Sequence, residues 1–289
     1  MSIVATPMVD AAPPNLVEQP TMHTDPATGH TLAFPADTAQ VTRKPGKGIQ
    51  EQPQPLEMAA NAMKVAAVVS HPRLGFMDHV CSLYGALVPL RISLHFGSGA
   101  YWGQCMERVM MKAIEEQKPD AILTLDYDTM FTMKDVGRLV HLMANNPSVD
   151  AIAALQSHRH EALPLMTILD KDRKPMKSIG MDYFMSDLSR ISTAHFGLTL
   201  LRVKSLLETP HPWFKAEPNS KGLWEEGRMD DDIFFWFNWE KAGKNLYLAN
   251  RVVIGHLELM VRWPGRDFRV MYQHPNDYRK DGPPIEAWQ

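Results

Sequence analysis

Short continuous apolar runs dominate the sequence between residues 64 and 155. Four of them have the length of a strand, at residues 64–70, 88–96, 121–125 and 150–155. The first is rich in β-branched and small residues, which is typical of a strand buried on both faces of a parallel sheet. Between the runs, apolar residues recur at helical spacing over residues 103–118 and 132–146. This alternation predicts a parallel sheet with right-handed crossovers and helices on both faces.

The pattern changes after residue 155. The elements predicted there are a hairpin over 165–179, a strand at 194–201, a helix near 203–207, a long loop at 210–229, a helix at 233–241 and extended pieces at 246–249 and 252–256. Loops as long as the one at 210–229 usually carry function. The predicted fold class is therefore α/β, with a mostly parallel central sheet, helices on both faces and a small antiparallel hairpin region.

Residues 1–60 differ in composition from the rest of the chain. They are rich in proline and hold a single aromatic residue, Phe34. Such a segment cannot bury enough apolar surface to offset the entropy lost on ordering. We predict a disordered, proline-rich tail over residues 1–60, a folded domain over 61–270 and a C-terminal tail over 271–289.

The chain as a whole has an ordinary globular composition. Its 289 residues are 45% hydrophobic and 22% charged, which is enough for a sizeable core. A net charge of −3 and a pI near 6.5 argue against nucleic acid as the main partner. Cys81 and Cys105 are too few for a disulfide framework. No apolar run reaches the roughly 20 residues of a membrane span, so we predict a cytoplasmic protein without a transmembrane segment.

Two carboxylates follow the apolar run at residues 121–125. Asp126 and Asp128 lie on a turn directly after this predicted strand, and ligands of open α/β sheets bind beyond the carboxyl ends of the strands. Two carboxylates on a short turn suit a hard divalent cation whose remaining ligands come from substrate phosphates. The alternative is a solvated turn, because this pattern is common at strand ends.

Three consecutive acids precede the predicted helix at 233–241. Packing of this apolar helix would hold Asp230, Asp231 and Asp232 at a fixed place near a positive helix end. One of them could act as a general base toward an acceptor hydroxyl, with a simple acidic helix cap as the alternative. His256, at the end of an apolar strand, could complete a manganese site, although a lone histidine there is more often a packed or surface residue.

The spacing of these groups resembles a known family. Asp231-Asp232 is followed by Gly243 after eleven residues and by His256 after thirteen more. This looks like the "Glu-Asp … Gly … His" segment of family 2-like glycosyltransferases with the GT-A fold. These enzymes transfer a sugar from a nucleotide-diphosphate donor.

Further segments carry the same resemblance. Asp126-Tyr127-Asp128 is similar to the Asp-x-Asp metal motif of the GT-A fold, and residues 195–202 resemble the strand that precedes the acceptor loop. The resemblance covers about residues 64–260, and it implies that the folded domain at 61–270 is a GT-A-like catalytic domain.

The resemblance implies a glycosyltransferase of the hexosyltransferase type. Asp126, Asp128 and His256 would bind Mn²⁺ or Mg²⁺ bridging the diphosphate of a nucleotide sugar, where the ion stabilises the leaving group. Asp232 would deprotonate the acceptor hydroxyl, and displacement would invert the anomeric carbon. Asp231 stands where the family has Glu, and it is the alternative base.

Contacts to the two substrates are implied as well. The residues expected to bind the donor nucleotide or its diphosphate are His71, Arg73, Arg108, Asp126 and Arg262. The acid that the family usually places after its second strand is absent from residues 95–99, so the donor nucleotide stays open. Trp224 is our candidate for the acceptor platform, because sugars pack their C–H faces on aromatic rings. A tryptophan that anchors the long loop is the alternative.

Two other functions compete with this hypothesis. One is a non-catalytic carbohydrate-binding or scaffold protein on the same fold. The other is a sugar-phosphate nucleotidyltransferase, which normally needs a Gly-rich, basic loop after the first strand, whereas residues 70–75 hold one Gly and one Arg. The acceptor is open among a glycan, a lipid-linked sugar, a protein and a modified nucleic-acid base.

Overall fold

The computed structural model describes residues 22–24, 31–33, 63–72, 74–158, 164–176 and 179–287. The chain divides into two units, Met1–Gln52 and Pro53–Gln289. In the first unit, β1 (Met22–Thr24) pairs in antiparallel register with β2 (Thr31–Ala33). Apart from these two strands, the predicted disordered tail at residues 1–60 lies outside the described residues.

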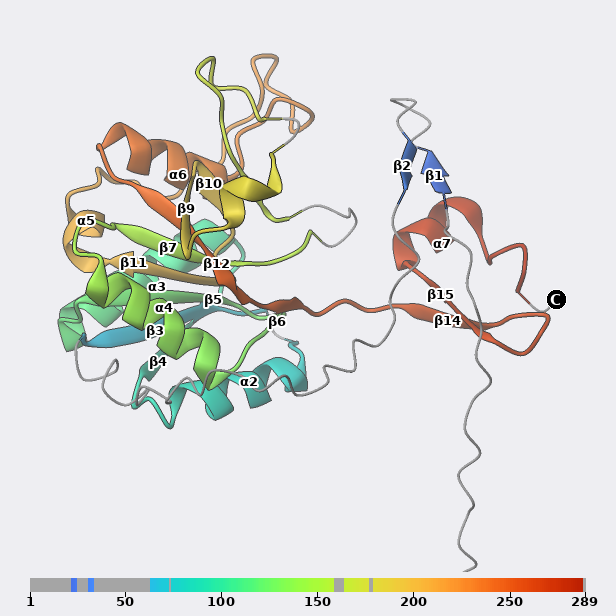
Figure 1. Cartoon of the computed structure of the whole chain (residues 1–289), viewed down its shortest axis with the longest axis horizontal. Helices are drawn as coiled ribbons and strands as arrows, with labels where there is room; N and C mark the ends of the chain where they lie inside the picture. Colours follow the sequence, from blue (N-terminus) through green and yellow to red (C-terminus); the bar gives the residue numbers. More distant parts are fainter. Residues whose placement is uncertain are drawn as a thin grey trace, which may run out of the picture. The chain divides into compact units, whose positions relative to one another are not determined.

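The second unit is built on a central sheet that has seven strands among the described residues. They are β3 (Val65–Ser70), β4 (Ser93–Gly97), β5 (Ala121–Asp126), β7 (Ala151–Leu155), β9 (Leu188–Ile191), β11 (Leu198–Arg202) and β12 (Leu246–Val253). Their order across the sheet is β4-β3-β5-β11-β7-β12-β9. All run in one direction except β11 and β9, which are antiparallel to their neighbours. The predicted α/β class with a mostly parallel sheet is confirmed (Figure 1).

Helices cover both faces of this sheet (Figure 1). One face carries α2 (Met77–Leu87) and α4 (Met133–Asn145), and the other carries α3 (Trp102–Gln117), α5 (Val203–Leu207) and α6 (Asp231–Lys241). Alternation along β3 supplies both cores. Val65, Ala67 and Val69 pack toward α2 and α4, whereas Ala66 and Val68 pack toward α3 and α6. Each fully buried valine contributes roughly 1.5–3 kcal/mol, so both helix layers stabilise the strand.

Smaller elements extend from the sheet. They are β6 (Thr129–Met130), β8 (Met166–Thr167), the 3₁₀-helix η1 (Met181–Phe184), β10 (Thr193–Ala194), β13 (Gly255–His256), β14 (Val261–Pro264), β15 (Val270–Gln273) and α7 (Pro275–Asp281). The antiparallel pairs are β6 with β13, β8 with β10 and β14 with β15. The first of these pairs joins the turn after β5 to the segment after β12. Among the described residues, no helix has the length and apolarity needed to cross a membrane.

The predicted strand at 88–96 is partly wrong. The helix α2, which the sequence pattern did not predict, ends at Leu87, and β4 begins only at Ser93. Apolar side chains lie exposed on α2 and just after it, at Met77, Tyr84 and Val88. A surface helix is normally recognised by a polar face opposite an apolar one, and apolar residues at exposed positions remove this contrast from the sequence.

Two other predictions concern the hairpin and the C-terminal end. In the predicted hairpin at 165–179, Asp170 N donates to Lys174 O at 2.8 Å across the turn, Met176 N donates to Ile168 O at 2.9 Å, and Leu169 and Pro175 form an antiparallel bridge. The two arms therefore pair beside the turn, while the preceding strand β8 pairs with β10. Near the C-terminus, β15 begins at Val270 and so extends past the predicted end of the domain, and α7 follows it. The division into a domain at 61–270 and a tail at 271–289 stays a prediction.

Candidate active site

The turn after β5 brings the first carboxylates to the carboxyl edge of the sheet. Asp126 is the last residue of β5, and Asp128 leads directly into β6. Since β6 pairs with β13, Thr129 lies opposite His256. The pairing places His256 Nε2 at 3.5 Å from Asp128 Oδ2. Two of the residues predicted to share a cation, far apart in the sequence, therefore lie together.

The orientation of the His256 ring suits a metal ligand. Its Nδ1 lies 3.1 Å from the carbonyl oxygen of Ser157. A carbonyl can only accept, so Nδ1 carries the proton and Nε2 is the atom that faces Asp128. The two side chains are 12% and 2% exposed. Metal-binding histidines usually donate one ring N–H to a backbone carbonyl or a carboxylate and bind the metal through the other nitrogen, which for His256 would be Nε2.

These groups line a cavity of about 430 Å³. Its lining residues are Trp102, Asp126, Tyr127, Asp128, His158, Leu165, His195, Phe196, Asp232 and His256. Within the described parts of the chain, no group of three or more His, Cys, Asp or Glu side chains is placed to hold a metal ion. The donor types of Asp126, Asp128 and His256, two carboxylates and an imidazole, are compatible with a divalent cation whose further ligands come from substrate phosphates.

Asp232 enters the same cavity from the N-terminus of α6. Its Oδ1 accepts from the backbone N–H of Ile233 at 2.8 Å. Burial raises the pKa of the Asp232 carboxyl above its usual value, because the charged form loses water. A carboxylate with a raised pKa is a stronger base than an ordinary one.

The two preceding acids have other partners. Asp230 accepts from Arg228 Nε at 2.8 Å on the surface. Asp231 Oδ2 accepts from the backbone N–H of Gly103, in the first turn of α3, at 3.2 Å. The three consecutive aspartates therefore point to three different places.

His195 forms a fixed, neutral part of the wall. Its Nε2 lies 2.9 Å from the Ala154 carbonyl oxygen, and its Nδ1 accepts from Gly197 N at 2.9 Å. These contacts require a neutral ring that is protonated at Nε2. Burial lowers the pKa of His195 to about 4, so the ring stays neutral at physiological pH.

Several lining residues were not among the predicted site residues. Trp102 and Phe196 give the cavity an aromatic side, and His158 joins it from the end of β7. His158 is one of two neighbouring histidines, and such a pair alone gives no metal-ligand pattern; the other, His160, lies outside the described residues. No spacing rule links Trp102 to acids more than a hundred residues away, since only the packing of α3 against α6 joins them.

Of the described residues predicted to bind the donor, Asp126 lines the cavity, whereas His71, Arg108 and Arg262 are not among its described lining residues. His71 Nδ1 lies 2.9 Å from Pro72 O, and its ring meets Phe96 edge-on. Arg108 Nη2 donates to Ser98 O at 2.9 Å. Arg73 lies outside the described residues. The donor roles of these three side chains stay predictions.

The remaining predicted contacts lie farther along the chain. The guanidinium of Arg262 lies 5.4 Å from the ring centre of Tyr272, within the β14–β15 hairpin. Trp224 is 61% exposed on the long loop. Neither residue lines the cavity that holds Asp232.

A second cavity, of about 310 Å³, shares Tyr127 and Asp128 with the first. Its other lining residues are Phe76, Leu257, Glu258, Leu259, His274, Pro275, Asn276 and Arg279. His274 Nε2 lies 2.8 Å from Glu258 Oε1. Among the described residues that line the two cavities, Arg279 is the only arginine or lysine.

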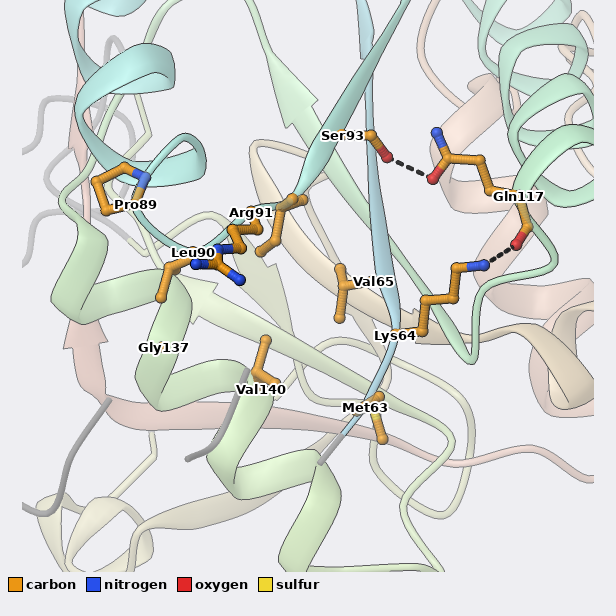
Figure 2. Close-up of a pocket in the computed structure, with 11 residues that line it drawn as sticks. Met63, Lys64, Val65, Pro89, Leu90, Arg91, Ser93, Gln117, Gly137 and Val140 are labelled. Atoms are coloured by element: carbon orange, nitrogen blue, oxygen red, sulfur yellow. Dashed lines mark hydrogen bonds between the residues drawn. The ribbon is translucent and has the colours of Figure 1, made fainter. Parts of the chain in front are cut away.

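A larger cavity, of about 580 Å³, lies at the opposite, amino edge of the sheet (Figure 2). It is bounded by the start of β3, the segment between α2 and β4, and one side of α4. Ser93 and Lys64 both donate to Gln117 there. None of its described lining residues is an Asp, Glu, His or Cys, so volume alone does not locate the chemistry.

No protein-family model matches this chain, and no curated protein matches it. Solved structures do. The structure of A197 from STIV is 15% identical, with a TM-score of 0.47 over 73% of this chain and 95% of that one. GalNAc-T7 with UDP, GalNAc and Mn²⁺ is 10% identical, with a TM-score of 0.47 over 68% of this chain and 44% of that one.

The mannosyltransferase PcManGT from Pyrobaculum calidifontis, in complex with GDP-Man and Mn²⁺, is 10% identical, with a TM-score of 0.42 over 68% of this chain and 57% of that one. This chain thus spans about half the length of the two transferases. At such identities and TM-scores the neighbours do not establish the chemistry of this chain.

Proposed function

We propose that this protein is a metal-dependent glycosyltransferase that moves a sugar from a nucleotide-diphosphate donor to an acceptor hydroxyl. One observation carries the proposal. A single cavity at the carboxyl edge of the sheet holds Asp126, Asp128 and His256 together with the partly buried carboxylate of Asp232. A cation site and a base beside one cavity are what displacement of a diphosphate by a hydroxyl requires.

The cation half consists of Asp126, Asp128 and His256. They would hold Mn²⁺ or Mg²⁺, and the bound ion would stabilise the negative charge that builds on the leaving diphosphate, an effect of several kcal/mol. The Ser157 carbonyl keeps Nε2 of His256 directed at the carboxylate of Asp128. The β6–β13 pairing fixes the separation of these two ligands before substrate arrives.

The base half is Asp232. Its carboxylate takes the proton of the acceptor hydroxyl as the acceptor oxygen bonds to the anomeric carbon. The bond from that carbon to the diphosphate breaks, and attack from the opposite face inverts the configuration. Asp231 is held by the N–H of Gly103, which favours Asp232 over Asp231 as the base.

The second cavity offers a place for the nucleotide half of the donor. Tyr127 and Asp128 form the boundary between the two cavities, so a diphosphate at Asp128 borders both. Arg279 on α7 would supply a fixed positive charge there, since arginine binds phosphate oxygens through a planar fork. Within this proposal, Arg279 takes the role that the sequence suggested for Arg262.

A donor screen tests the proposed function. The full chain with Mn²⁺ is incubated with UDP-, GDP- and dTDP-sugars, and release of the free sugar is measured with and without a chelator. We expect slow, metal-dependent hydrolysis of at least one donor, lost in Asp128→Asn and retained in the surface variant Asp187→Asn. A well-folded wild type that hydrolyses none of the donors would contradict the proposal.

Two further assays, of sugar binding and of nucleotidyl transfer, separate the competing functions. A non-catalytic carbohydrate-binding protein would bind sugars without any turnover, and Asp232→Asn would leave that binding unchanged. A sugar-phosphate nucleotidyltransferase would instead join a nucleoside triphosphate to a sugar phosphate and release pyrophosphate. Neither result is expected.

A further inference from the structure

The aromatic side of the active-site cavity is built around Trp102. Trp102 is the first residue of α3, is partly buried and lines the cavity together with Asp232. Its ring centre lies 5.4 Å from that of Phe196 and 5.2 Å from that of Phe214, at interplanar angles of 66° and 83°. These edge-to-face contacts hold the indole in one orientation. The site thus contains a fixed aromatic surface beside the proposed base.

One backbone contact couples this aromatic surface to Asp232. Gly103, next to Trp102, donates its N–H to Asp231, next to Asp232. A Cβ at Gly103 would lie 2.5 Å from Asp231 Oδ2 and 2.7 Å from Phe214 Cβ. The first turns of α3 and α6 therefore touch with no space between them. The positions of the indole and of the carboxylate are set by the same contact.

The two sides of the cavity differ in chemistry. Phe196, Phe214 and Phe235 belong to the core on the α3 and α6 face of the sheet, and Trp102 packs against that core. The β6–β13 pair, which joins the Asp128 turn to His256, is flanked by Phe131 and Ile254, and these two residues are buried in the core on the other face. A donor diphosphate at the cation ligands would therefore leave the Trp102 side to the other substrate.

A sugar ring matches that side better than a protein side chain does, and the net charge of −3 disfavours a nucleic-acid acceptor. Its axial C–H groups form an apolar, slightly positive face that suits the negative face of an indole, while its hydroxyls point outward from the ring edge. A ring stacked on Trp102 would present one such hydroxyl toward Asp232. A serine or threonine side chain of a protein acceptor has no ring with which to use this surface.

We propose that Trp102 is the acceptor platform and that the acceptor is a carbohydrate, either a free glycan or the glycan part of a lipid-linked sugar. This inference rests on the proposed function. It replaces Trp224 as the platform candidate, since Trp224 does not line the cavity. Asp231 acts as a positioning residue, because it holds the α3 turn that carries the platform.

The test compares Trp102→Ala and Trp102→Phe with wild type and with Tyr101→Ala, an exposed neighbour outside the cavity. The full chain is supplied with Mn²⁺ and the donor identified by the screen. The acceptors are trisaccharides of glucose, mannose and galactose, a polyprenyl-phosphate-linked sugar, a serine- and threonine-containing peptide, and a nucleoside. Thermal unfolding shows whether each variant is folded.

We expect transfer to a carbohydrate. In Trp102→Ala the KM for that acceptor rises about tenfold with a smaller change in kcat. Trp102→Phe keeps an aromatic face and restores most of the affinity. Tyr101→Ala behaves as wild type.

Failure of this inference looks different from failure of the proposed function. If wild type hydrolyses a donor but transfers only to the peptide or the nucleoside, the carbohydrate assignment is wrong. If Trp224→Ala raises the acceptor KM and Trp102→Ala does not, the platform assignment is wrong. If no donor is hydrolysed, the proposed function fails, and calorimetric titration of the trisaccharides into wild type and Trp102→Ala still tests sugar binding by Trp102. Equal affinities, or no binding to either, overturn the inference.

Discussion

Replacing Gly103 by alanine tests the contact between α3 and α6 on which the geometry of the site depends. Gly103 and Gly85 both lie inside helices, so helix propensity alone predicts that alanine stabilises each of them by up to about 1 kcal/mol. At Gly85 an added Cβ has nothing within 4 Å, whereas at Gly103 it meets Asp231 Oδ2 at 2.5 Å. The two substitutions should therefore have opposite signs.

The magnitude follows from two overlapping costs at Gly103. Inserting an atom into a filled contact costs about 1–3 kcal/mol. Displacing Asp231 weakens a hydrogen bond to a charged group, itself a contribution of about 1.5–3 kcal/mol. After subtraction of the gain in helix propensity, we expect Gly103→Ala to lower the free energy of unfolding by about 1–3 kcal/mol. Gly85→Ala should raise it by a few tenths to about 1 kcal/mol.

Thermal and urea unfolding, followed by circular dichroism, measure both variants. About 2–4 °C per kcal/mol is expected for a domain of this size, so Tm should fall for Gly103→Ala and rise slightly for Gly85→Ala. Donor-to-acceptor transfer should fall only in Gly103→Ala, since displacement of Asp231 also moves Trp102 and Asp232. A Gly103→Ala variant as stable as Gly85→Ala would refute the tight packing of the two helix starts.

Three further predictions concern single charges. Because burial raises the pKa of Asp232, its ionised form opposes folding at pH 7. Asp232→Asn should therefore have a higher Tm than wild type at pH 7 and should lose transfer activity. The difference in Tm should shrink as the pH falls toward the ordinary pKa of an aspartate. His195 has a pKa lowered to about 4, so wild-type stability should fall as the pH drops from about 6.5 toward 4, by about 3 kcal/mol in total, and urea unfolding of His195→Asn should lack this slope. Arg279→Ala should raise the KM for the nucleotide sugar about tenfold. Arg269 is an exposed arginine paired with Asp267, and Arg269→Ala should leave this KM unchanged. Equal effects of the two substitutions would exclude a specific contact between Arg279 and the diphosphate.

The sequence predicted the parallel core because that core depends on local signals. The apolar run at 121–125 is such a signal, because it acts within a few residues. The helix ends are local as well: Thr132 N donates to Asp135 Oδ2 at 2.8 Å at the start of α4, and Gly243 has a φ of 75° just after α6. The antiparallel insertion of β11 between β5 and β7 was not predicted, because strand order is set by long-range pairing.

For the site, the sequence indicated which chemical groups matter but not all of their neighbours. Motif spacing linked Asp128 to His256, and the structure places these residues 3.5 Å apart. Spacing could not assign Arg108 or Arg262, since the partners of a long side chain depend on packing. It also could not find Trp102 or Arg279, because each reaches a cavity only through elements that meet in three dimensions.

The central claim is that Asp126, Asp128 and His256 hold a divalent cation at the edge of a nucleotide-sugar site. Anomalous diffraction from crystals soaked with Mn²⁺ and uridine or guanosine diphosphate tests it most directly. We predict a manganese peak at coordination distance from Asp128 Oδ2 and His256 Nε2, with diphosphate oxygens completing the shell. A peak elsewhere, or none at saturating Mn²⁺ with the nucleotide bound, would contradict the claim.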